Sequence, residues 1–367
     1  MVQMNNAGKV PMAEARKKSA PLGDITNILG GPARAGTAQL VRERAIFEAT
    51  NQVQDMDGSL PKRARSQSVA TTASTGGSGH SSTLPASVEA LEEEEDDEMM
   101  MDNDDQDPQF CSEYADDVCR VLLYSERNDR LASPAYMTFQ TDINARMRAI
   151  LVDWLVEVQL KYKLKSLTLY LSVNILDRFL QVECVQQQHL QLVGVTCMLI
   201  ASKFEEIYLP EVKDFVYICA DAYTREDILD MEVHILNRLG FQLCAPTLGQ
   251  FIDRYSIVNS CSEEHRFLLQ YLVELTLPEV CMLKYPPSHL VASALWLSNK
   301  CLRKSPAWPP AMEAETGKKA GDVKVCAREI CRILELAPQE EYESKAVYRK
   351  FSSSKLGKVA LMRHCDP

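Results

Sequence analysis

The stretch MRAILVDWLVEV, residues 147–158, decides the fold because it predicts a helix with two apolar sides. At about 100° per residue, one face gathers Met147, Ile150, Leu151, Trp154 and Val158. The opposite face gathers Ala149, Val152 and Val156. Charged residues separate the two groups. Such a helix is either buried on both sides, or buried on one side and used for docking on the other.

Helical spacing of apolar residues continues from this stretch towards the C-terminus, and strand-like alternation is scarce. The first series of predicted helices covers 145–161, 167–181, 189–204, 210–220 and 224–238. The second series covers 247–257, 262–276, 287–302, 321–335 and 339–351. Two successive sets of five helices predict an all-α chain with a repeated domain. Thr224 and Asp227 predict a capping box, and Gly240 the end of that helix.

Two segments lie outside these series. The sequence PQFCSEYADDVCRVLLYSERN, residues 108–128, predicts an isolated amphipathic helix ahead of the first domain. The stretch SPAWPPAMEAETGKKAG, 305–321, is the longest interruption in the second series and is interpreted as a surface loop. Residues 1–106, rich in Ser, Thr, Gly and acidic side chains, are predicted to be disordered because they cannot bury enough apolar surface.

The charge is concentrated in that N-terminal segment. Residues 1–107 hold ten basic and eighteen acidic side chains, so they carry −8 of the net charge of −11 and the other 260 residues carry −3. This balance argues against binding to nucleic acid or an anionic membrane through a general positive field. No apolar run approaches the roughly 20 residues that span a bilayer, and MVQMNNAGKV lacks a signal peptide's apolar stretch. We therefore expect an intracellular chain without a membrane partner.

Signals for catalysis or metal binding are missing from the sequence. It contains no GxGxxG, GxxxxGK[ST], GxSxG or HExxH motif, and its twelve cysteines include no CxxC pair. The cysteines are interpreted as small buried residues in a reducing compartment. We expect no enzymatic activity, no metal and no cofactor.

Four charged residues stand out because they occur within apolar predicted helices: Arg148, Asp177, Lys203 and Glu232. An unpaired buried charge costs several kcal/mol, so each needs a partner. That partner lies either inside the helical bundle or on another protein.

Three stretches carry a family resemblance. MRAILVDWLVEV, LQLVGVTCMLIASKFEEIYLPEVKDFVYI and YTREDILDMEVHIL closely resemble the cyclin box of the mitotic A/B-type cyclins, and the match extends in order from about residue 108 to 360. The resemblance implies a disordered regulatory tail at 1–106, an N-terminal helix and linker at 107–143, and cyclin boxes at 144–243 and 244–367. CSEYADDV and LQLVGVT favour the B type, whereas CAPTLGQF favours the A type.

The resemblance implies a regulatory subunit that activates a cyclin-dependent kinase and controls the cell cycle at G2/M, with S/G2 as the alternative stage. It would bind the kinase's C helix and reposition the catalytic Lys–Glu pair and the activation loop. The residues that match the family's kinase-binding positions are Tyr114, Val118, Val121, Lys203, Phe204, Glu205, Glu206, Glu232, Leu236 and Phe241. Arg148 and Asp177 match the family's internal ion pair.

The resemblance also implies a surface that captures RxL-type motifs of substrates or inhibitors. Its matching residues are Met147, Ile150, Leu151, Trp154, Glu157, Leu190 and Gln191. The face with Ala149, Val152 and Val156 would then be the buried one. Burial of a ligand leucine would contribute about 1.5–3 kcal/mol, which is a docking effect.

The N-terminal segment contains two short motifs. SAPLGDITN, 19–27, is similar to a mitotic destruction box, with matches at Leu22, Gly23, Asp24, Ile25, Thr26 and Asn27. Ser19 replaces the motif's arginine, so the box is degenerate as a signal for the ubiquitin ligase of mitotic destruction. PKRAR, 61–65, is a candidate nuclear localisation signal, and we expect the protein in nucleus and cytoplasm.

Two other classes compete with this interpretation. A transcription-initiation factor with two cyclin-like domains would show a basic surface and an N-terminal zinc ribbon, and this sequence has neither. A cyclin-fold scaffold without kinase activation is disfavoured by Lys203, Glu232 and the N-terminal helix.

Overall fold

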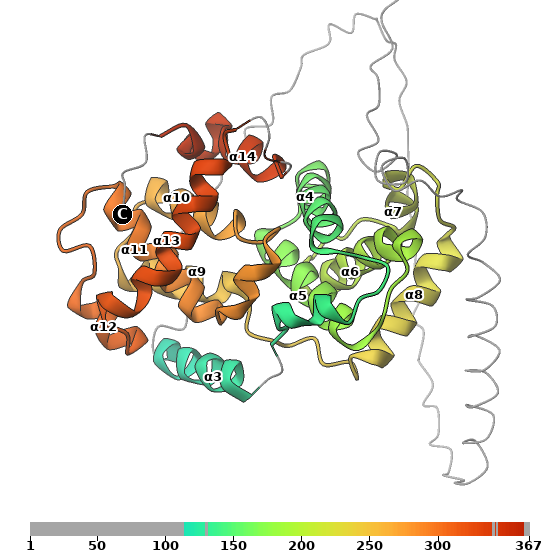
Figure 1. Ribbon diagram of the computed structural model, residues 1–367, viewed down its shortest axis with the longest axis horizontal. Coiled ribbons are helices and arrows are strands. Elements are labelled where there is room, and N and C mark those ends of the chain that lie inside the picture. Colours follow the sequence, from blue (N-terminus) through green and yellow to red (C-terminus); the bar gives the residue numbers. More distant parts are fainter. Residues whose placement is uncertain (1–113, 129–130, 340–341, 343, 363–367) are drawn as a thin grey trace, which may run out of the picture. The chain divides into compact units, whose positions relative to one another are not determined.

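The computed structural model describes residues 114–128, 131–339, 342 and 344–362, which all belong to one compact unit. All regular elements in this described part are helical, which confirms the all-α prediction (Figure 1). The predicted disordered tail, the degenerate destruction box and the basic cluster at 61–65 lie outside the described residues.

Two series of helices follow one another along the chain. The first part contains α3 (Ala115–Asn128), α4 (Ala145–Lys161), α5 (Ser166–Val182), α6 (Leu190–Glu205), α7 (Val212–Ile218) and α8 (Arg225–Arg238). The second contains α9 (Leu248–Val258), α10 (Glu263–Glu274), α11 (Pro287–Cys301), α12 (Pro310–Thr316), α13 (Ala320–Leu336) and α14 (Ala346–Phe351). Short 3-10 turns are η2 (Pro134–Thr138), η3 (Gln187–His189), η4 (Val280–Lys284), η5 (Ser354–Leu356) and η6 (Val359–Leu361).

Each series is built around one central helix. In α6, every residue from Leu190 to Ser202 is buried, and the helix packs against α4, α5 and α8. In α11, every residue from Leu290 to Asn299 is buried, and the helix packs against α9, α10 and α13. A helix that is apolar on all sides is stable in water only when other helices surround it. These two helices therefore form the centres of the two boxes.

Local signals set several helix ends. Thr224 and Asp227 form the predicted capping box at the start of α8, and Gly240 follows α8 with a φ of 60°. This left-handed conformation favours glycine. In α6, a Cβ atom on Gly194 would lie 2.7 Å from Leu151 Cδ1, so glycine permits the close approach of α4.

Two sequence-based predictions in the second box are wrong. The stretch 305–321, interpreted as a loop, contains α12, which starts at prolines and ends at Gly317 with a φ of 64°. Trp308 and Met312 are buried, so this segment contributes to the core. The helix predicted at 339–351 is α14, which begins only at Ala346.

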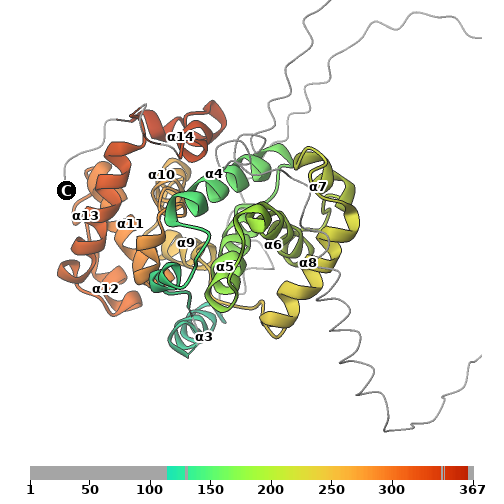
Figure 2. The ribbon, with the colours of Figure 1, turned by 45° about the vertical axis from the view of Figure 1, so that its right-hand side comes forward.

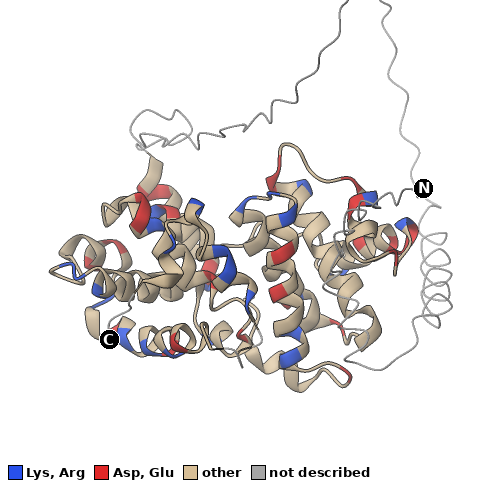
Figure 3. Ribbon diagram, turned by 90° about the horizontal axis from the view of Figure 1, so that it is seen from above, with Lys and Arg blue, Asp and Glu red and all other residues tan. Residues whose placement is uncertain are grey.

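The helices found here differ from membrane-spanning ones. Among the residues that the structure describes, no helix combines the length and the apolar character needed to cross a bilayer. Figure 3 shows basic and acidic residues interspersed over the described ribbon. This mixture agrees with the small net charge of residues 108–367.

Candidate functional site

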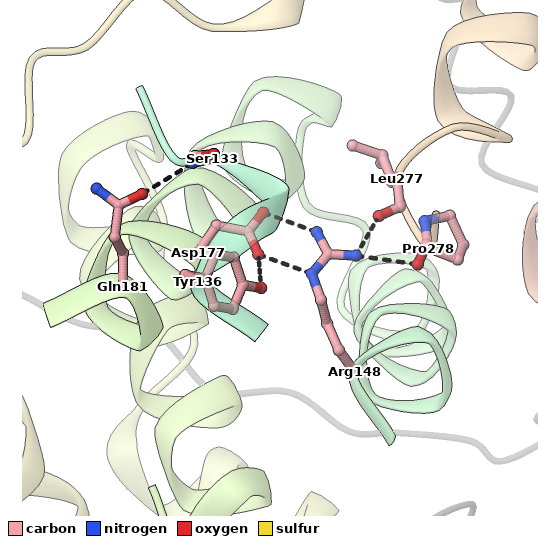
Figure 4. Close-up of polar contacts among 7 residues, drawn as sticks. All are labelled: Ser133, Tyr136, Arg148, Asp177, Gln181, Leu277 and Pro278. Atoms are coloured by element: carbon pink, nitrogen blue, oxygen red, sulfur yellow. Dashed lines mark hydrogen bonds and ion pairs between the residues drawn. The ribbon is translucent and has the colours of Figure 1, made fainter. Parts of the chain in front are cut away.

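Arg148 and Asp177 form a buried ion pair between α4 and α5 (Figure 4). Arg148 Nε and Nη2 donate to the two Asp177 oxygens, each at 2.7 Å. The hydroxyl of Tyr136, in η2, donates to Asp177 Oδ1 at 2.7 Å. Two-point pairing of a guanidinium with a carboxylate is the strong geometry for such a buried pair. The pair predicted from the sequence is therefore present.

The same arginine joins the two boxes. Arg148 Nη1 donates to the carbonyl oxygens of Leu277 and Pro278, at 2.9 and 3.0 Å, which lie just beyond α10. Burial by itself lowers the pKa of Arg148, but the adjacent Asp177 carboxylate outweighs it and raises the pKa above its ordinary value. Arg148 is thus a permanently charged cross-link inside the molecule.

Lys203 and Glu232 form a second ion pair, between α6 and α8. Lys203 Nζ lies 2.7 Å from each carboxylate oxygen of Glu232. The Lys203 side chain is 43% exposed and that of Glu232 is 11% exposed. Unlike Arg148 and Asp177, this pair therefore reaches the surface, where a partner protein could contact it.

Large apolar side chains are exposed close in sequence to Lys203 and Glu232. They come from the end of α6, the loop that follows it, and the region at the end of α8: Phe204, Ile207, Tyr208, Leu209, Val233 and Phe241. Tyr208 is the extreme case, with 92% of its surface exposed. Leu236 is only partly buried. We call the six exposed residues the first-box apolar surface. Exposure of several large apolar side chains is typical of a protein interface.

Helix α3 adds a second exposed apolar stripe. Tyr114, which precedes α3, together with Val118, Val121 and Tyr124 is more than half exposed. The opposite side of the helix contains buried Cys119 and Glu126. The spacing of the exposed residues places them on one helical face. The three predicted residues, Tyr114, Val118 and Val121, are therefore available for binding.

Two further predicted binding residues are partly used within the chain. Glu206 accepts hydrogen bonds from the backbone nitrogen of Lys165 at 2.7 Å and from the hydroxyl of Thr168 at 2.5 Å. It therefore caps the start of α5. Glu205 is half-buried, and burial raises the pKa of its carboxyl above the ordinary value. Neither carboxylate is freely exposed to a partner.

The predicted docking patch on α4 and α6 is mostly below the surface. Leu151, Trp154, Leu190 and Gln191 are buried. Met147, Ile150 and Glu157 are partly exposed. On the opposite face, Val152 and Val156 are buried, whereas Ala149 is only partly so. Close packing of α4 on α6 at Gly194 explains the burial of Leu151.

Two buried polar atoms of the patch, the indole nitrogen of Trp154 and the side-chain nitrogen of Gln191, have no hydrogen-bond partner within the described residues. A buried donor without an acceptor costs about 1–3 kcal/mol.

Four further residues that the sequence-based predictions did not include are Tyr124, Glu126, Ile207 and Tyr208. Ile207 and Tyr208 follow a buried helix, and an apolar pair in a short loop was the available signal. Tyr124 continues the exposed stripe of α3 by helical spacing. No local sequence pattern indicates the role of Glu126, because its hydrogen-bond partner Ser288 lies 162 residues away.

Comparison with protein families agrees with this arrangement of helices. The family described as Cyclin, N-terminal domain matches residues 117–244, and the family described as Cyclin, C-terminal domain matches residues 246–364. The chain belongs to the cyclin family. The N-terminal family match includes most of α3 as well as the first box, and the two matches meet between α8 and α9.

Curated relatives and a solved structure support the same assignment. This cyclin is 40% identical over 70% of its length to "G2/mitotic-specific cyclin-B" of Marthasterias glacialis. It is 45% identical over 68% of its length to "G2/mitotic-specific cyclin-A" of Hydra viridissima. The alignments span 66% and 59% of those relatives. A viral cyclin from herpesvirus saimiri shares the fold, with a TM-score of 0.55 and 20% identity over 63% of this chain and 99% of the viral one.

Proposed function

We propose that this cyclin is a regulatory subunit that binds and activates a cyclin-dependent kinase at the G2/M stage and performs no chemistry itself. The observation that carries the proposal is the first-box apolar surface, close in sequence to the Lys203–Glu232 pair. The relatives of both A and B type are described as G2/mitotic-specific, which supports the stage. No observation favours the alternative classes of scaffold or transcription-initiation factor.

The proposed mechanism is a shift in the kinase's conformational population. The first-box apolar surface and the exposed face of α3 would contact the kinase C helix and the surface beside it. Kinase activity requires the Lys–Glu pair and the activation loop to be in place. Binding activates only if these side chains contact the active arrangement more favourably than the inactive one. Burial of the exposed aromatic side chains would supply the differential affinity.

A second element of the proposal is recruitment of substrates or inhibitors through RxL-type motifs. Partly exposed Met147 and Ile150 would contact the apolar side chain of the motif. The unpartnered Trp154 indole would donate to the peptide backbone. Glu157 would attract the motif's arginine because a carboxylate pairs well with a guanidinium.

The remaining elements concern residues outside the described part. We also propose that a ubiquitin ligase binds residues 22–27 and directs destruction of the protein. Recognition would be weak because Ser19 replaces the arginine of the motif. We also include entry into the nucleus through residues 61–65 and a distribution between nucleus and cytoplasm.

Kinase activation is the first test. The full chain is titrated into monomeric cyclin-dependent kinases, and phosphorylation of histone is measured. The Lys203→Ala/Glu232→Ala variant removes the charged pair of the proposed interface. Because interface hot spots contribute 2 kcal/mol or more, we expect half-maximal activation to need at least about thirtyfold more cyclin.

The matched control is Lys284→Ala/Glu329→Ala in the second box. That pair also has a lysine–carboxylate distance of 2.7 Å and a lysine that is 45% exposed. It should leave activation unchanged. Activation lost equally in both variants would indicate a general effect on folding and contradict the proposed surface. Absence of binding and activation across a panel of these kinases would favour a scaffold or transcription role.

A further inference from the structure

Helix α14 of the second box lies against α4 of the first box (Figures 1 and 2). The backbone nitrogen of Ala346 donates to Asp153 Oδ1 at 2.8 Å. One turn further along each helix, Arg349 Nη2 donates to Glu157 Oε1 at 2.6 Å. Asp153 and Glu157 are four residues apart and therefore lie on the same side of α4. Two successive contacts thus place α14 along the α4 side that contains Glu157.

The backbone beneath Arg349 is held firmly in place. The neighbouring Lys350 is buried, and its Nζ donates to both oxygens of Glu274 on α10, at 2.8 and 2.9 Å. The same nitrogen donates to Gln159 Oε1 on α4 at 3.1 Å. Val347 and Phe351 are buried as well. Because these groups anchor α14, the Arg349 side chain stays within reach of Glu157.

Glu157 is also the acidic member of the proposed docking patch. It lies three residues after Trp154 and is therefore its neighbour on the helix surface. An incoming arginine would need the Glu157 carboxylate, because paired charged hydrogen bonds require both partners. The Arg349 side chain is 63% exposed and that of Glu157 is 28% exposed, so solvent and ligands can reach the pair. The Arg349–Glu157 ion pair can therefore be replaced by a pair between Glu157 and an arginine of the ligand.

We propose that Arg349 is an internal competitor for the arginine of a docking motif. This inference rests on the proposed docking function of the α4 patch. While Arg349 binds Glu157, the arginine of an RxL-type motif contributes little to affinity, and the apolar residue of the motif dominates. A residue of the second box thereby changes which peptides bind most tightly to the docking patch of the first box. The occupant is a short basic–apolar peptide segment of a substrate or inhibitor.

The effect is measurable by peptide binding to the full chain. Two fluorescent peptides have the same flanking sequence and contain either Arg-Ala-Leu or Ala-Ala-Leu, and binding is followed by fluorescence anisotropy. The Arg349→Gln variant should bind the arginine peptide two- to fivefold more tightly, the range typical of an exposed ion pair. Its affinity for the alanine peptide should stay unchanged. In the Glu157→Gln background, Arg349→Gln should have no effect on either peptide.

The control is Arg332→Gln, which removes an exposed arginine from α13. It corrects for the loss of one positive charge from the protein as a whole. Equal changes in Arg349→Gln and Arg332→Gln would overturn the competitor role while leaving docking intact. No binding of either peptide to the wild type or to Arg349→Gln would overturn the docking function and the inference together. Kinase activation, measured separately, distinguishes that failure from loss of the regulatory role.

Discussion

Asp153 is a single side chain whose ionisation is linked to the contact between α4 and α14. Burial raises the pKa of its carboxyl to about 6, and nearby Glu157 adds to the rise. The hydrogen bond from Ala346 and the charge of Arg349 act in the opposite direction. The folded chain therefore retains a proton on Asp153 at pH values where the unfolded chain has released it. Ionisation of Asp153 destabilises the folded state.

We predict that Asp153→Asn stabilises the protein at pH 7. Since the folded pKa exceeds the ordinary value near 4, the cost of ionisation is absent below pH 4 and complete above pH 6. The difference in free energy of unfolding should grow to roughly 2–3 kcal/mol between these limits. Urea unfolding at several pH values measures it, with exposed Asp221→Asn as the baseline for removing one acidic side chain. A difference that does not vary with pH would contradict the prediction.

At the scale of the element, α3 combines an exposed apolar face with an anchoring face. Glu126 near its end accepts hydrogen bonds from the backbone nitrogen and the hydroxyl of Ser288, at 2.7 and 2.6 Å. Ser288 lies in the first turn of α11, which starts at prolines and has no side-chain cap of its own. Glu126 thus caps α11 from another element, and its negative charge suits the positive end of the α11 dipole.

Removing this cap should loosen α3. In Glu126→Ala, loss of a capping carboxylate should cost about 1–2 kcal/mol of α3 docking, because buried Ser288 loses its acceptor. Hydrogen exchange of the α3 amides should become roughly five- to thirtyfold faster, and kinase activation should weaken. Glu126→Gln keeps an acceptor without the charge and should be intermediate. Exposed Arg120→Ala serves as the control, and unchanged exchange in Glu126→Ala would rule out the anchoring role.

At the scale of the whole molecule, buried polar contacts join the two boxes. Arg148 connects α4 and α5 with carbonyl groups of the second box, and Lys350 connects α14 with α4 and α10. Such contacts contribute orientation, because a guanidinium or ammonium bonds well only to partners in specific directions. The boxes are therefore expected to unfold cooperatively.

The Arg148→Met variant tests this coupling. It leaves the Asp177 carboxyl buried without its cationic partner, with the Tyr136 hydroxyl as a donor, so we expect a loss of about 3–5 kcal/mol. The double variant Arg148→Met/Asp177→Leu removes both charges and should recover much of that loss. Calorimetry compares melting temperatures and cooperativity. A single variant as stable as the wild type would show that Arg148 does not couple the boxes.

Much of the helical framework could be predicted from local pattern. The helix predicted at 145–161 has those bounds in the structure, and the capping residues Thr224 and Asp227 act as expected. Helical periodicity and caps depend on neighbouring residues, which the sequence displays directly. The prediction failed at α12, because prolines and charges there resemble a loop until the burial of Trp308 and Met312 is known.

By itself, the sequence determined most of the helices, the pairing candidates and the family resemblance. Only the tertiary structure decided which of these residues face solvent. Both faces of α4 are largely buried, because α6 covers one side at Gly194 and leaves only Met147, Ile150 and Glu157 of the predicted patch partly exposed. The contact between Arg349 and Glu157 joins residues 192 positions apart. No local pattern encodes such a contact, because it exists only once packing brings the two boxes together.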